Sequence, residues 1–259
     1  MYEWERDALT RLTFGGTGAT PVWTPDGQRI AFSSWTSAGT RDGISWRRAD
    51  GTGDVQRLTE VNGVPMSWDP NGKLLAFQFT HPQTGWDLMV LPIQGDETRG
   101  WQPGKPFVFL NSPQSTTTPV FSSDGRWVAY RSNESGQTEV YVRPFPSPGG
   151  QWLISTDGGS FPKWSRTGRE LFYGTEDGEI MVVPYSADGN SFRAEKPRPW
   201  SERRFSVSTS WTGGFDLHPD GQRFALATIR DNQTAVKQDK VVFIFNFFDE
   251  LRRLAPARR

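Results

Sequence analysis

The chain has 259 residues, a formal net charge of zero and no cysteine. A neutral charge argues against a surface that follows nucleic-acid phosphates, and the missing cysteines exclude disulfides and thiolate metal sites. No apolar stretch approaches the roughly 20 residues that cross a bilayer, and the opening residues, MYEWERDALT, have no apolar signal core. With 14% aromatic residues, 27 Gly and 19 Pro, the composition favours many short strands joined by tight turns. We therefore expect no nucleic-acid partner and no direct membrane insertion of this chain.

A short phrase that ends in a turn glycine recurs five times along the sequence. The copies are WTPDG at 23–27, WDPNG at 68–72, FSSDG at 121–125, WSRTG at 164–168 and LHPDG at 217–221. Proline fixes one turn dihedral, Asp or Asn caps the turn through its side chain, and glycine takes the left-handed conformation. The glycines are 43 to 53 residues apart, which is close to the length of one four-stranded propeller blade.

Strand-forming segments surround each of these turns. The expected inner strands are 21–24, 66–69, 119–122, 162–165 and 214–217. The expected second strands are 30–32, 75–77, 128–130, 171–173 and 224–226. The expected third strands are 44–48, 86–92, 139–143, 179–183 and 241–247. Fourth strands are expected at 55–59, 107–110, 152–156 and about 199–200.

The last repeat lacks a fourth strand, and the N-terminus offers one. LTRLT at 9–13 matches VQRLT at 55–59, so pairing of the N-terminal strand with 241–247 would close a ring and hide two sheet edges. We expect a single all-β propeller domain over 1–259 with five four-stranded antiparallel blades, and the alternative is a fragment of a six-bladed propeller. The expected blades are 20–60, 64–111, 118–157, 161–205 and 212–248 with 8–13.

Several of these phrases resemble a known family. PVWTPDGQRIAF at 21–32 resembles the WD40-like (PD40) repeat of TolB-type propellers. LTRLTFGG at 9–16, TGWDLMVLP at 84–92 and DGRWVAYRSNESGQTEVYVRPFP at 124–146 resemble the C-terminal propeller of bacterial, eukaryotic-like serine/threonine kinases. The resemblance implies a periplasmic or extracellular sensor or interaction module. The family's opening blade and the kinase motifs are absent from the sequence, which puts the six-bladed count in doubt and excludes phosphate transfer.

Enzymatic alternatives meet specific obstacles in the sequence. A five-bladed glycan-acting hydrolase needs paired carboxylates in the axial funnel, and the inner strands offer Asp69 and Asp216 in different repeat columns. Asp216 fits a structural ion pair with Lys163 better. The two histidines, His81 and His218, are too few for a histidine-held ion, and His218 occupies a turn-capping position. We expect no metal site, no cofactor and no catalysis.

Tryptophan is the remaining signal, with 12 copies. Trp23, Trp68 and Trp164 share one repeat column and are expected to form core between blades. Other residues fall in the loops that gather at one end of a propeller, where aromatic side chains favour recognition. The candidate binding residues are Trp35, Arg41, Asp42, His81, Trp86, Asp87, Glu134, Glu139 and Trp211. We expect a non-catalytic recognition or scaffold module that binds a protein or small molecule at this loop face or channel mouth; the other alternative is an isolated or engineered fragment without a ligand.

Overall fold

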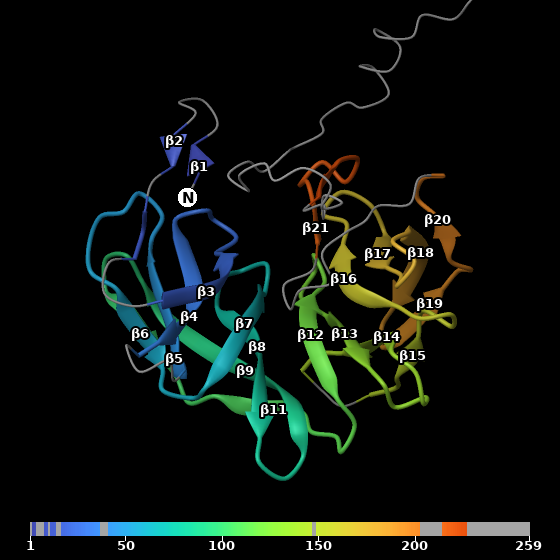
Figure 1. Ribbon diagram of the computed structural model, residues 1–259, viewed down its shortest axis with the longest axis horizontal. Helices are drawn as coiled ribbons and strands as arrows, with labels where there is room; N and C mark the ends of the chain where they lie inside the picture. Colours follow the sequence, from blue (N-terminus) through green and yellow to red (C-terminus); the bar gives the residue numbers. More distant parts are fainter. Residues whose placement is uncertain are drawn as a thin grey trace, which may run out of the picture. The chain divides into compact units, whose positions relative to one another are not determined.

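The computed structural model describes residues 2–3, 8–9, 11–13, 17–36, 41–146, 149–202 and 214–226. The chain divides into two compact units, Met1–Gly158 and Gly159–Arg259. The described residues form strands and turns without helices (Figure 1). Accordingly, no membrane-spanning helix is found within these described ranges.

The first unit contains three larger antiparallel sheets, each built from one sequence repeat, and a two-stranded sheet near the N-terminus. The first is β3 (Thr17–Trp23), β4 (Arg29–Trp35), β5 (Arg41–Arg48) and β6 (Gln56–Thr59). The second is β7 (Gly63–Trp68), β8 (Leu74–His81), β9 (Gly85–Asp96) and β10 (Gly100–Pro103), with β11 (Phe107–Leu110) also paired to β9. The third is β12 (Thr116–Phe121), β13 (Trp127–Ser132), β14 (Glu139–Pro144) and β15 (Trp152–Leu153).

The second unit repeats the same plan. Its larger sheet is β16 (Ser160–Trp164), β17 (Glu170–Gly174), β18 (Ile180–Asp188) and β19 (Ser191–Ala194), with β20 (Arg198–Pro199) also paired to β18. A hairpin of β21 (Phe215–Leu217) and β22 (Phe224–Leu226) begins the fifth repeat. The four-stranded antiparallel sheets expected from the repeats are confirmed. The count of five blades stays a prediction.

Each repeat turn is held by one backbone pattern. The first turn residue donates its N–H to the carbonyl five residues later, as Thr24 does to Arg29 at 2.9 Å and Asp69 to Leu74 at 2.9 Å. The turn glycine of the third repeat also lies close to the preceding turn. A Cβ on Gly125, which has φ +70°, would lie 3.2 Å from Cδ of Pro70. The recurring phrase therefore encodes both the hairpin and the contact between neighbouring blades.

The core lies between successive sheets. Trp68 packs with Ala31, Ile44 and Trp46 of the first blade, and its ring stacks on Trp46 at 5.9 Å. Phe121 packs in the same way on Ala76 and Val90 of the second blade. Each of these aromatic residues thus depends on the blade that precedes it in sequence.

The expectation of a buried Trp23 was wrong. Trp23 is 48% exposed, whereas Trp68 and Trp164 in the same repeat column are each 6% exposed. Among the described residues of the first unit, no blade precedes β3, so Trp23 lacks the preceding sheet that covers Trp68.

The N-terminal segment departs from the expected strand at 8–13. Within it, β2 (Ala8–Leu9) pairs with β1 (Tyr2–Glu3), and residues 11–13 are not in a strand. The carbonyl of Leu12 accepts a hydrogen bond from Arg47 of the first blade. The expected partner strand at 241–247 lies outside the described residues, so ring closure stays a prediction.

Candidate functional site

The candidate residues of the first unit lie where second and third strands of a blade meet. Trp35 ends β4, and Arg41 and Asp42 begin β5. In the second blade, His81 ends β8, while Trp86 and Asp87 follow the start of β9. Glu134 and Glu139 occupy the corresponding loop and strand start of the third blade. We call this side of the blades the loop end; Trp211 lies outside the described residues.

In the first blade, aromatic and charged side chains meet at the loop end. The Arg41 guanidinium lies over the Trp35 ring, 5.1 Å from its centroid. Burial lowers the pKa of Arg41, as expected when a cation loses water. Asp42 pairs with Arg57, and both side chains are substantially exposed. These contacts leave a partly exposed aromatic and charged surface.

In the second blade, His81 and Trp86 remain partly buried at the loop end. The backbone N–H of Gln83 donates to Nδ1 of His81 at 3.3 Å, and the His81 ring lies edge-on to Phe79 at 6.1 Å. Trp86 is paired with Thr80 across the β8–β9 hairpin. In the third blade, the exposed Glu134 contacts the amide of Gln151.

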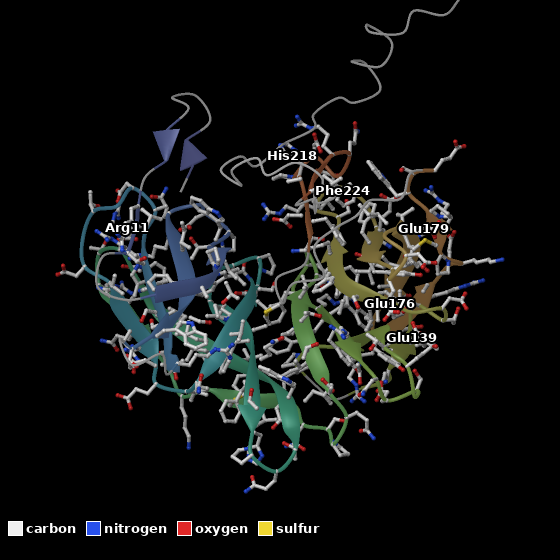
Figure 2. The ribbon with its side chains drawn as sticks, viewed as in Figure 1. Arg11, Glu139, Glu176, Glu179, His218 and Phe224 are labelled. Atoms are coloured by element: carbon white, nitrogen blue, oxygen red, sulfur yellow. The ribbon has the colours of Figure 1, made fainter. Side chains whose placement is uncertain are left out.

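Asp87 and Glu139 are structural rather than available for a ligand. Asp87 is 2% exposed and accepts hydrogen bonds from the Thr84 hydroxyl at 3.0 Å and the Asn111 amide at 3.2 Å. Glu139, labelled in Figure 2, is 1% exposed and accepts from the Ser155 hydroxyl and from the Gly158 N–H. Both carboxylates lie near the start of the third strand of a blade and bind the segment that leaves that blade. These hydrogen bonds compensate for the water that the buried carboxylates lose.

The two carboxylates of the glycosidase alternative have different local roles. Asp69 is buried, and its Oδ1 accepts the backbone N–H groups of Lys73 and Leu74 at 2.7 Å each. The Asp216 side chain is 74% exposed and forms the expected ion pair with Lys163 at 3.1 Å. They also belong to separate units. Asp69 therefore caps a turn, and Asp216 anchors a neighbouring strand.

A cavity that the sequence did not predict opens at the opposite end of the first two blades. It has a volume of about 270 Å³. Its walls come from the first two repeat turns and the aromatic residues beneath them: Thr24, Pro25, Asp26, Arg29, Trp46, Pro70, Asn71, Gly72 and Trp101. Asp26 and Arg29 are its ionisable residues, and no group of three His, Asp or Glu side chains suited to a metal occurs among the described residues.

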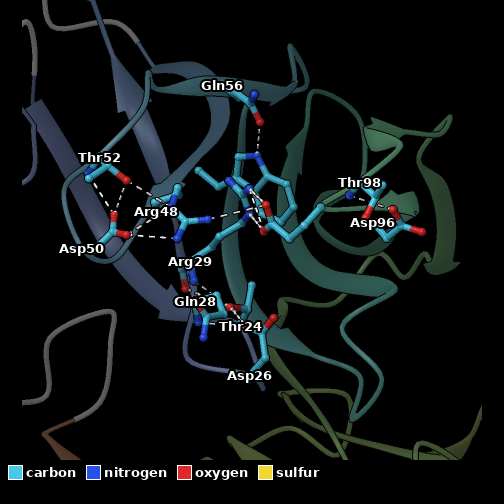
Figure 3. Close-up of polar contacts among 12 residues, drawn as sticks. Thr24, Asp26, Gln28, Arg29, Arg48, Asp50, Thr52, Gln56, Asp96 and Thr98 are labelled. Atoms are coloured by element: carbon cyan, nitrogen blue, oxygen red, sulfur yellow. Dashed lines mark hydrogen bonds and ion pairs between the residues drawn. The ribbon is translucent and has the colours of Figure 1, made fainter.

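Arg29, labelled in Figure 3, lines this cavity and forms an ion pair with Glu97 of the second blade. The Arg29 guanidinium binds Glu97 through two nitrogens, with Nη2–Oε1 at 2.9 Å and Nε–Oε1 at 3.2 Å. It also lies over the Trp46 ring, 4.7 Å from the centroid. Because Arg29 and Glu97 are 68 residues apart and in no shared repeat column, the sequence carried no signal for this pair.

The comparisons with solved structures identify the fold. TolB from Acinetobacter baumannii matches with a TM-score of 0.56 and 19% identity over 84% of this chain and 50% of that one. A protein assigned as TolB from Agrobacterium tumefaciens matches with a TM-score of 0.54 and 19% identity, covering 70% and 66% of the respective chains. The chain folds as a TolB-like β-propeller. It spans only half to two thirds of the length of these two structures.

Enzymes share this propeller architecture as well. A protein assigned as 6-phosphogluconolactonase from Bacteroides uniformis matches with a TM-score of 0.52 and 12% identity, covering 82% of this chain and 62% of that one. No protein-family model matches the sequence, and the search of curated proteins gave no match. The TolB-like propeller fold is therefore established without an activity.

Proposed function

We propose that this TolB-like propeller is a non-catalytic protein-recognition module whose partner binds at the loop end. The observation that supports this proposal is that some polar residues are used inside the fold and others stay at the surface. Of the two carboxylates of the glycosidase alternative, Asp69 is buried and accepts backbone N–H groups, and Asp216 is exposed and paired with Lys163. At the loop end, Asp87 and Glu139 are buried and already hydrogen-bonded within the protein. At the loop end Trp35, Arg41 and Trp86 stay partly exposed, and Asp42 and Arg57 form an exposed ion pair, a composition that suits recognition.

The finer proposal is that the module belongs to a kinase-type protein and serves as its sensor or interaction domain. Its support is the resemblance of DGRWVAYRSNESGQTEVYVRPFP at 124–146 to kinase-linked propellers. A TolB-like propeller fold also suggests an interaction scaffold. In this role the rigid blades would present Trp35, Arg41 and Trp86 to a partner without chemical change.

Site-specific photo-crosslinking in the source cell tests this proposal. A photoreactive phenylalanine analogue replaces Trp35 or Trp86, and a matched control carries it at Gln28. Gln28 is exposed at the turn end of the first blade, at the other end of β4 from Trp35. We expect a discrete protein adduct from the loop-end positions and none from Gln28. Equal labelling at all three positions would argue against a loop-end partner.

An activity screen addresses the non-catalytic part of the proposal. The intact chain is assayed against a panel of aryl glycosides beside Asp69→Ser and Asp216→Asn variants. We expect no turnover above buffer from any of the three. Hydrolysis by the intact chain that disappears in Asp216→Asn would overturn the non-catalytic assignment.

A further inference from the structure

The outer edge of the second blade has an unusual surface. Five large apolar side chains are exposed among the described residues, and two of them, Phe107 at 39% and Val108 at 52%, are neighbours on β11. β11 pairs with β9 on one side and forms an edge of the sheet on the other. An edge strand presents unpaired backbone N–H and C=O groups, so another extended strand can add to it.

Two other outer strands carry charges that discourage such pairing, whereas β15 of the third blade is uncharged like β11. β6 contains Arg57, which pairs with Asp42, and β20 contains Arg198, which lies 3.7 Å from Glu170. β11 reads Phe-Val-Phe-Leu and has no charged residue. Charged residues on edge strands are a common protection against unwanted pairing, and this edge lacks them.

The same strand is firmly anchored on its inner side. Phe109 packs against Phe145 with ring centroids 5.6 Å apart, and Leu110 packs against Leu88, Tyr130 and Tyr141. The strand is therefore held in an extended form while Phe107 and Val108, on opposite faces of the sheet, remain exposed. A partner would gain backbone hydrogen bonds without having to order this edge first.

We propose that β11 is a docking strand that accepts an extended, apolar segment of a partner protein, followed by an acidic residue. Lys105 supplies the charge preference, because it is exposed just before β11 and forms no ion pair within the described part of the chain. In antiparallel pairing, the C-terminal end of the added segment lies beside this lysine. The inference rests on the proposed function in taking the partner to be a protein.

A second copy of the chain fits this edge less well than a separate partner. Stable complexes bury about 800 Å² on each side, and a four-residue strand paired with itself offers much less. Self-pairing would also place each Lys105 near the uncharged Asn111 of the other copy. A longer segment of a different protein can cover the strand and also reach Lys105.

Peptide binding to the full chain tests the docking strand. The probe is the capped peptide Thr-Val-Thr-Val-Thr-Val-Glu-Glu, followed by anisotropy and by hydrogen exchange at residues 107–110. We expect the peptide to bind and to slow hydrogen exchange at these amides. Binding should be about tenfold weaker to the V108K variant, and about tenfold weaker when every second peptide nitrogen is methylated. The matched control is L153K, which charges the exposed Leu153 on the neighbouring outer strand β15 and should leave binding unchanged.

The opposite results are equally specific. Binding that V108K leaves intact, or no slowed exchange at millimolar peptide, would overturn the docking strand. A doubled mass in light scattering that V108K restores to a monomer would replace the partner segment with a second copy. The loop-end crosslinks are measured separately in V108K. If they persist while peptide binding is lost, the loop-end partner and the docking strand are independent, so one proposal can fail while the other stands.

Discussion

At the scale of single residues, one turn position shows that geometry, rather than residue type, is repeated. Thr24, Asp69, Ser122, Ser165 and His218 occupy the same repeat column. Each accepts a backbone N–H within its own turn, for example from Leu74 to Asp69 Oδ1 at 2.7 Å and from Asp220 to His218 Nδ1 at 3.2 Å. The sequence-based expectation that His218 caps its turn is confirmed. The hairpin requires an acceptor at this position and tolerates several chemistries.

Asp69 should therefore be replaceable by serine and not by alanine. Asp69→Ala leaves the N–H groups of Lys73 and Leu74 without their side-chain acceptor, at a cost of about 2 kcal/mol of unfolding free energy. Asp69→Ser restores an acceptor of the kind present at Ser122, so it should recover most of that loss. Urea unfolding of the three proteins measures the difference. Equal destabilisation by both variants would show that the carboxylate has a further role.

Asp220 should give the second unit an acid-sensitive turn. Hydrogen bonding from the Gln222 N–H, with further contributions from Arg223 and His218, holds the pKa of Asp220 at about 2, below its ordinary 3.8. Because the folded pKa is depressed, its stabilising effect is present above pH 4 and disappears as the pH falls toward 2. Asp220→Asn introduces the residue found at Asn71 of the second turn. In this variant the midpoint of urea unfolding should depend less on pH between pH 4 and pH 2. An unchanged acid profile would contradict this assignment.

At the scale of elements, the repeat phrase predicted hairpins and sheets because turn chemistry and strand alternation are local. It did not predict β10 and β19, which extend long hairpins by short segments such as Gly-Trp-Gln-Pro. It also failed for Trp23, whose burial depends on a neighbouring blade rather than on its own strand. Asp87 and Glu139 were proposed as binding residues because of their position in the loops. Both are buried, and their partners Asn111 and Ser155 lie 24 and 16 residues away in the segments that leave the blades.

The Arg29–Glu97 pair should couple the first two blades energetically. Its bidentate geometry and the 10% exposure of the Arg29 side chain favour a coupling of about 1 kcal/mol. A double-mutant cycle with Arg29→Met and Glu97→Gln measures this coupling, which should shrink as salt rises. The more exposed Glu170–Arg198 pair, 3.7 Å apart within one sheet of the second unit, is the control and should show no measurable coupling. Additive effects at low salt would assign Arg29 a packing role on Trp46 alone.

At the scale of the whole molecule, the N-terminal segment has a local role and a proposed wider one. Locally, the Leu12 carbonyl accepts from Arg47, and the Thr13 methyl lies 3.5 Å from where a Gly18 Cβ would stand. The repeat count adds the proposal that 8–13 supplies the outer strand of the fifth blade. The two roles differ in what they do to sheet edges. Only ring closure would cover the unpaired edges of the first and last blades, whereas the local contacts would leave them open.

Deleting residues 1–13 should therefore cost more than losing the Arg47 contact. Arg47→Ala removes the hydrogen bonds to the carbonyls of Leu12 and Gly51 and leaves the N-terminal segment in the chain, so it gives the baseline for loss of these local contacts. If 8–13 closes the ring, the deletion should lower the melting temperature by several degrees beyond Arg47→Ala, since each kcal/mol corresponds to roughly 2–4 °C in a chain of this size. The deleted chain should also associate through its freed edges, raising the mass measured by light scattering. A deletion that matches Arg47→Ala in melting temperature and stays monomeric would leave the segment a local cover on the first blade and favour a propeller completed in another way.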